Sequence, residues 1–214
     1  MTPMFTAARR RGLSAALALA LGAALVIPLA GCDGKAPGAP PRAAFKGVDI
    51  TGAEYARTLQ LADVDGQPRS LVDWKGKVVV VFFGYTQCPD VCPTNLLGMA
   101  EVMRQLGPDA EKVQVLFITV DPERDTQALL AEYVPAFDKR FAGLYGDVET
   151  TAAVARDFKV FYQKQGDTKG MAYTIDHSTG TYVFDPQGRL RLYVKHGEKP
   201  EVIAGDLRKL LAGK

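Results

Sequence analysis

The chain has 214 residues, of which 47% are hydrophobic and 23% charged, a composition typical of a globular protein with one buried core. Residues 1–31 contain three arginines and no acidic residue, so the rest of the chain has 23 basic and 24 acidic residues and a formal charge of −1. This near-neutral body offers no electrostatic basis for binding nucleic acid, and we expect no nucleic-acid partner.

The first 31 residues have the pattern of an export signal. Three consecutive arginines precede the apolar run 12–30, and small residues lead to Cys32 in "LAGC". This end resembles the lipobox of bacterial lipoproteins, in which the cysteine is lipidated and becomes the first mature residue. We therefore expect residues 1–31 to be a lipoprotein-type signal peptide and Cys32 to carry the lipid. An uncleaved transmembrane anchor is the alternative, because the run is close to the ~20 residues that a span needs.

Residues 32–50 follow as a segment rich in proline, glycine and alanine. Such a composition buries little surface and predicts a flexible tether. Asp33 directly follows the expected lipidation site, which resembles the signal that keeps lipoproteins on the inner membrane of enteric-type bacteria. The expected location is therefore the periplasmic face of a bacterial inner membrane.

Residues 51–214 predict one α/β domain. A hairpin turn is expected at Asp65–Gly66, and the continuous apolar run 78–85 predicts a strand buried on both faces. A helix, a strand, two helices, a hairpin and a final helix are then expected over residues 93–107, 113–121, 125–137, 149–158, 181–195 and 199–213. This order predicts a thioredoxin-like central mixed sheet flanked by helices.

Cys88 and Cys92 lie in "FFGYTQCPDVCPTNL", where the buried strand leads into the first helix. In a thioredoxin-like fold this junction delivers thiols to a helix N-terminus, whose dipole favours thiolate. Three residues separate these cysteines, whereas thioredoxin-type oxidoreductases have two. The spacing allows the sulfurs to converge on a soft cation such as Cu(I) or Zn, or to form a disulfide. A purely structural disulfide is less favoured, because so short a loop restricts the unfolded chain little.

The chain offers two histidines as a third ligand, His177 and His196. His177 is expected in a loop before the hairpin strand, after the polar stretch 158–176, and such a loop lies across from the cysteines in a thioredoxin-like fold. His196 follows the last strand and is expected at the opposite end of the strand pair. His177 is therefore the better candidate, with Asp176 as a residue that orients its ring or tunes the local field.

The motifs "GYTQCPDVCPTNL", "ITVDPERDT" and "YTIDHSTGTYVFDPQGRL" resemble the Sco/SenC family, the copper-binding assembly proteins of cytochrome c oxidase. The likeness covers roughly residues 55–213. It implies a thioredoxin-like fold in which Cys88, Cys92 and His177 hold copper as Cu(I) or Cu(II), with a Cys88–Cys92 disulfide when oxidised. Asp121 and Asp125 match a family stretch near the site, and we expect them to be turn and helix-cap residues.

Three functions are compatible with these motifs. The first is a membrane-anchored extracytoplasmic copper metallochaperone for the dinuclear copper A site of the oxidase, with the copper-site subunit and a copper donor chaperone as partners. The second is a thiol–disulfide oxidoreductase that reduces the cysteines of that subunit, with one thiol as nucleophile and the other resolving. A peroxidase or redox sensor is the third and accounts least well for His177. Whether the protein is an enzyme is left open.

Overall fold

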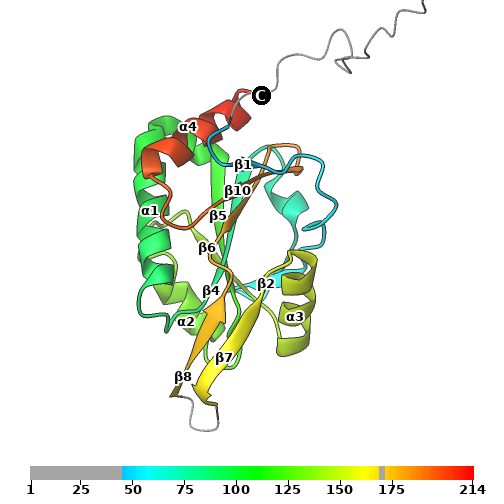
Figure 1. Ribbon diagram of the computed structural model, residues 1–214, viewed down its shortest axis with the longest axis vertical. Helices are drawn as coiled ribbons and strands as arrows, with labels where there is room; N and C mark the ends of the chain where they lie inside the picture. The colour runs from blue at the N-terminus through cyan, green and yellow to red at the C-terminus, as the bar shows by residue number, and fades with distance from the viewer. Residues whose placement is uncertain (1–44, 169–171) are drawn as a thin grey trace, which may run out of the picture. The chain divides into compact units, whose positions relative to one another are not determined.

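The computed structural model describes residues 45–168 and 172–214 (Figure 1). The expected signal peptide, Cys32, Asp33 and most of the tether lie outside these residues. Within the described ranges, no helix has the length and hydrophobicity required to cross a membrane.

A mixed sheet of eight strands forms the centre of the domain, in the order β1-β10-β9-β4-β5-β6-β2-β3. Its middle strands β4, β5 and β6 are parallel, and the strands outside them pair antiparallel with their neighbours. The predicted central mixed sheet is therefore confirmed. The strands are β1 (Val48–Asp49), β2 (Leu61–Asp63), β3 (Pro68–Arg69), β4 (Val78–Gly84), β5 (Val113–Thr119), β6 (Ala142–Tyr145), β9 (Thr181–Phe184) and β10 (Leu190–Val194).

Helices cover both faces of this sheet, as predicted. In Figure 1, α1 and α4 lie side by side on one face, and α3 lies on the other. The helices are α1 (Val91–Leu106), α2 (Gln127–Tyr133), α3 (Val148–Asp157) and α4 (Pro200–Leu211), with two short 3₁₀ helices, η1 (Leu71–Trp74) and η2 (Gly107–Lys112).

Strand β4 places the cysteines at one end of the sheet. All seven of its residues are buried, because its β-branched and aromatic side chains pack under helices on both faces. It pairs with β5 on one side and β9 on the other, so its register is fixed along its length. The cysteine loop therefore leaves the carboxyl end of a rigid central strand, the position where open α/β sheets commonly carry their sites.

The polar stretch 158–176 contains most of a β-hairpin. Strands β7 (Tyr162–Asp167) and β8 (Ala172–His177) pair with each other as a separate two-stranded sheet. Alternate residues of β8 are buried, Tyr173 and Ile175 among them, which is the period of a half-buried strand. The expected loop position of His177 is therefore wrong, because this residue ends a strand.

Candidate metal centre

The two cysteines sit on either side of a helix start. Cys88 lies in the loop after β4, and Cys92 lies in the first turn of α1, which begins two residues earlier than predicted. The backbone N–H of Cys92 donates to Cys88 Sγ at 3.4 Å, so the first thiol satisfies one of the free amides at the helix end. Cys92 is buried and Cys88 is partly exposed, and both are free thiols here.

His177 approaches the thiols from the end of β8. Its Nε2 lies 3.4 Å from Cys92 Sγ, and its Nδ1 lies 2.9 Å from the carbonyl oxygen of Ser178. Because a carbonyl only accepts, Nδ1 carries the proton and a neutral ring presents Nε2 as a lone pair. The rings of Phe82 and Tyr85 meet the imidazole edge-on, with centroids 6.1 and 5.9 Å away.

Cys88, Cys92 and His177 each offer one ligand atom, and these atoms lie within 4.8 Å of one another. The residues come from a loop, a helix and a strand that are far apart in the sequence. Two sulfurs and one imidazole nitrogen match a soft or borderline cation. The structure therefore brings together all three residues that the sequence analysis selected.

Asp176 does not orient the ring through a hydrogen bond. Its carboxylate accepts from Gln165 Nε2 at 3.0 Å, on the exposed side of the hairpin, whereas Ser178 holds His177. That part of the expectation is wrong, because adjacent strand residues point to opposite faces. The Asp176 charge still acts on His177 through the local field.

Burial controls the protonation of the site. It raises the pKa of the Cys92 thiol far above its ordinary range, although the helix dipole favours thiolate. It also lowers the pKa of His177 below its ordinary value. In the metal-free chain, burial therefore opposes the effect of the helix dipole on the Cys92 thiol and favours its protonated form. Metal binding must release the Cys92 proton.

Asp125 is a buried acceptor and not the expected helix cap. Thr126 caps α2 instead, accepting from the backbone N–H of Leu129 at 3.2 Å. The Asp125 carboxylate accepts from Thr119 Oγ1 at 2.6 Å, from Thr86 Oγ1 at 2.6 Å and from the Thr86 backbone N–H at 3.0 Å. It thereby ties the cysteine loop to the end of β5, a role that depends on contacts between distant segments.

His196 lies at the same end of the sheet as the thiols, contrary to the prediction. The β9–β10 register pairs Val194 with Thr181, and Thr181 pairs with Phe82 near the end of β4. Residues that follow β10 therefore emerge beside the start of β9, next to the site. His196 is exposed and is not among the three clustered ligands.

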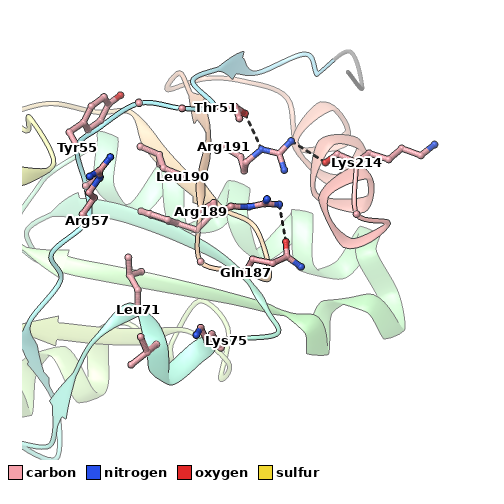
Figure 2. Close-up of a pocket in the computed structure, with 17 residues that line it drawn as sticks. Thr51, Tyr55, Arg57, Leu71, Lys75, Gln187, Arg189, Leu190, Arg191 and Lys214 are labelled. Atoms are coloured by element: carbon pink, nitrogen blue, oxygen red, sulfur yellow. Dashed lines mark hydrogen bonds between the residues drawn. The ribbon is translucent and has the colours of Figure 1, made fainter. Parts of the chain in front are cut away.

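A cavity of about 740 Å³ lies at the other end of the sheet (Figure 2). Phe184 in its wall pairs with Val79 at the start of β4. Arg189 and Arg191 also line it, but both pair with the buried Asp185, at 2.7 and 3.1 Å. One buried carboxylate thus pairs with both guanidinium groups, and the cavity is separate from the thiols.

A model of the SCO1/SenC family matches residues 49–212. The chain belongs to this family. The match begins and ends close to the limits of 55–213 expected from the motifs, and it confirms the Sco/SenC resemblance.

Two solved SCO1/SenC structures share the fold of this chain. Bradyrhizobium japonicum ScoI with copper bound is 39% identical, with a TM-score of 0.65, over 78% of this chain and 100% of that one. The apo Sco1 protein of Thermus thermophilus is 36% identical, with a TM-score of 0.71, over 80% of this chain and 100% of that one. These likenesses confirm the thioredoxin-like fold.

The mouse mitochondrial SCO2 homologue is 39% identical to this SCO1/SenC chain over 154 residues, which are 71% of this chain. The aligned part spans 60% of the length of the mouse protein. The likeness therefore concerns the folded domain.

Proposed function

We propose that this SCO1/SenC protein is a copper metallochaperone that assists assembly of the dinuclear copper A site of cytochrome c oxidase. The observation that carries the proposal is the convergence of Cys88, Cys92 and His177, whose ligand atoms lie within 4.8 Å of one another. Family membership and a copper-bound relative support copper as the cargo.

The donor set fits copper that is carried and then released. Two thiolates favour Cu(I), and one imidazole nitrogen makes Cu(II) acceptable. Three protein ligands leave a coordination position open for a ligand of the acceptor. Cys88 is partly exposed, which gives an acceptor access to the site from its side.

The proposal includes an extracytoplasmic location. Residues 1–31 act as the signal peptide, lipidated Cys32 anchors the segment that follows it as a tether, and the copper-binding domain includes β1 (Val48–Asp49), which pairs with β10. The sequence pattern "LAGC" and the basic and apolar segments before it support this anchor. The partners are then the copper-site subunit of the oxidase and a copper donor chaperone, on the periplasmic face of the inner membrane.

A thiol–disulfide oxidoreductase is the second candidate, favoured by the closeness of the thiols. The Cys92 amide contacts Cys88 Sγ at 3.4 Å, and Cys88 is the more exposed thiol. Cys88 thiolate would attack the disulfide of the oxidase subunit and form a mixed disulfide. Cys92 would then displace the partner thiol, leaving a Cys88–Cys92 disulfide and a reduced partner. Two electrons and two protons pass to the partner.

Two reactions with the purified copper-site domain of the oxidase separate these functions. In one, copper-loaded protein is mixed with the reduced apo domain, and the visible spectrum of the assembled site is followed. In the other, copper-free reduced protein is mixed with the oxidised domain, and free thiols are counted. We expect assembly in the first reaction. Thiol transfer in the second without assembly in the first would contradict the metallochaperone.

A further inference from the structure

The three candidate ligands belong to two substructures that share no strand pairing. Among the described residues, β7 and β8 pair only with each other, whereas the cysteine loop extends from the central sheet. A short link, residues 178–180, joins His177 to β9. Contacts between side chains must therefore fix the distance from the hairpin to the cysteine loop.

One segment, residues 119–125, contacts the cysteine loop. The Asp125 carboxylate accepts hydrogen bonds from Thr86, two residues before Cys88. Arg124 Nη1 donates to Gln87 Oε1 at 3.3 Å, directly beside Cys88. The segment begins at the last residue of β5, the neighbour of β4, so it is anchored in the sheet that carries the thiols.

The same segment also contacts the hairpin. Arg124 Nη1 donates to the carbonyl oxygen of Tyr173 at 2.8 Å, and its guanidinium carbon lies 3.6 Å from the centroid of the Tyr173 ring. The Tyr173 hydroxyl donates to Asp121 Oδ1 at 2.7 Å, and Arg124 Nε donates to Asp121 Oδ2 at 2.5 Å. Asp121 and Arg124 therefore contact the backbone carbonyl, the ring and the hydroxyl of Tyr173.

Burial strengthens these contacts with Tyr173. The side chains of Arg124 and Asp121 are 3% and 0% exposed, so water competes little for their hydrogen bonds. A second pair, Lys164 with Glu123, joins the same hairpin to the same segment, but its side chains are 29% and 46% exposed. Exposed pairs of this kind contribute little to stability. These buried contacts, together with the hydrogen bond that the Ile175 backbone N–H donates to Tyr85 Oη at 3.2 Å, hold the hairpin in position.

We propose that Asp121, Arg124 and Asp125 are positioning residues that set the distance between the imidazole and the two thiols. Tyr173 transmits their effect, because residues four apart on a strand lie on one face and Tyr173 shares that face with His177. The expected effect on copper binding rests on the proposed function. The positioning of the ring rests on the metal-free fold alone.

The test compares Arg124→Met and Tyr173→Phe with the matched control Glu123→Gln. In the metal-free parent we expect nuclear Overhauser contacts between the ring protons of His177 and Tyr85, whose centroids are 5.9 Å apart. Both test variants should lose or weaken them. Their Cu(II) affinity should fall roughly tenfold, equivalent to about 1.4 kcal/mol, with an altered nitrogen coupling in the electron paramagnetic resonance spectrum. The control should match the parent in every measurement.

Tyr173→Phe removes only one oxygen atom, so it keeps the test valid if the loss of Arg124 prevents folding. Parent-like ring contacts and parent-like nitrogen coupling in a folded test variant would overturn the proposal. A parent that binds no copper through nitrogen would contradict the proposed function. The ring contacts of the metal-free variants would still decide the positioning role.

Discussion

The backbone of Gly84 lies directly against the sulfur of Cys92. A Cβ atom at position 84 would stand 2.8 Å from Cys92 Sγ and 2.9 Å from Phe117 Cε2, closer than carbon atoms pack in proteins. Gly84 is the last residue of β4, so the strand approaches the thiol without a side chain between them. Any larger residue at this position must displace either the sulfur or the aromatic core.

Replacing Gly84 by alanine should therefore damage both stability and metal binding. We expect a loss of about 1–3 kcal/mol in the free energy of unfolding, the usual cost of overpacking, and weaker copper binding as Cys92 moves. Gly98→Ala is the matched control, because Gly98 in α1 has open space around it and alanine favours a helix by about 0.5–1 kcal/mol. Urea denaturation and copper titration of both variants measure these effects. Equal copper affinity in the two would contradict the close approach.

His177→Ala should separate the two oxidation states of copper. Cu(II) relies on the imidazole more than Cu(I) does, so its affinity should fall roughly 100-fold while that of Cu(I) falls less than about tenfold. His196→Ala is the control, since this exposed histidine lies at the same end of the sheet but outside the clustered ligands. Competition titrations under anaerobic conditions give both affinities. An unchanged Cu(II) affinity in His177→Ala would remove this residue from the site.

Cys88→Ser and Cys92→Ser should each abolish stoichiometric copper binding with the fold retained. A hydroxyl is a poor ligand for Cu(I), so the loss of either sulfur leaves too few soft donors. Burial makes Cys92 the costlier position, with about 1–3 kcal/mol expected for a poorly bonded hydroxyl. Circular dichroism checks the fold of each variant. Partial unfolding of both would point to a structural disulfide.

Acid should destabilise the metal-free chain through His177. Burial lowers its pKa from 6.5, so the unfolded chain takes up this proton more readily than the folded chain. This contribution to stability is complete above about pH 6.5 and is lost as the pH falls toward the folded pKa. His177→Ala should lose part of this acid sensitivity, measured by urea midpoints above and below that range. The same slope in parent and variant would argue against the buried imidazole.

The sequence predicted the sheet centre and the three ligands because their signals are local. The apolar run that became β4 needs no distant partner to be recognised, and the Cys88–Cys92 spacing is visible in one short stretch. His177 could be selected because only two histidines exist and "YTIDHSTGTYVFDPQGRL" resembles a Sco/SenC motif, although the opposite position expected for His196 is wrong.

The missed features depend on contacts between distant segments. Asp125 was expected to cap a helix, yet its partner Thr86 lies 39 residues away. The β9–β10 register determines the end of the sheet at which His196 lies. The β7–β8 hairpin was hidden by its polar composition, although the alternation of Tyr173, Ile175 and His177 gave a signal with the period of a strand.

Copper titration of the fully reduced chain, repeated on the disulfide-oxidised chain without oxygen, tests the central claim most directly. The thiols are ligands only when reduced, so the account predicts one tightly bound copper per reduced chain and no tight copper on the oxidised chain. A reduced chain that binds no copper tightly, but shows a well-defined dithiol reduction potential, would contradict the metallochaperone and favour the oxidoreductase.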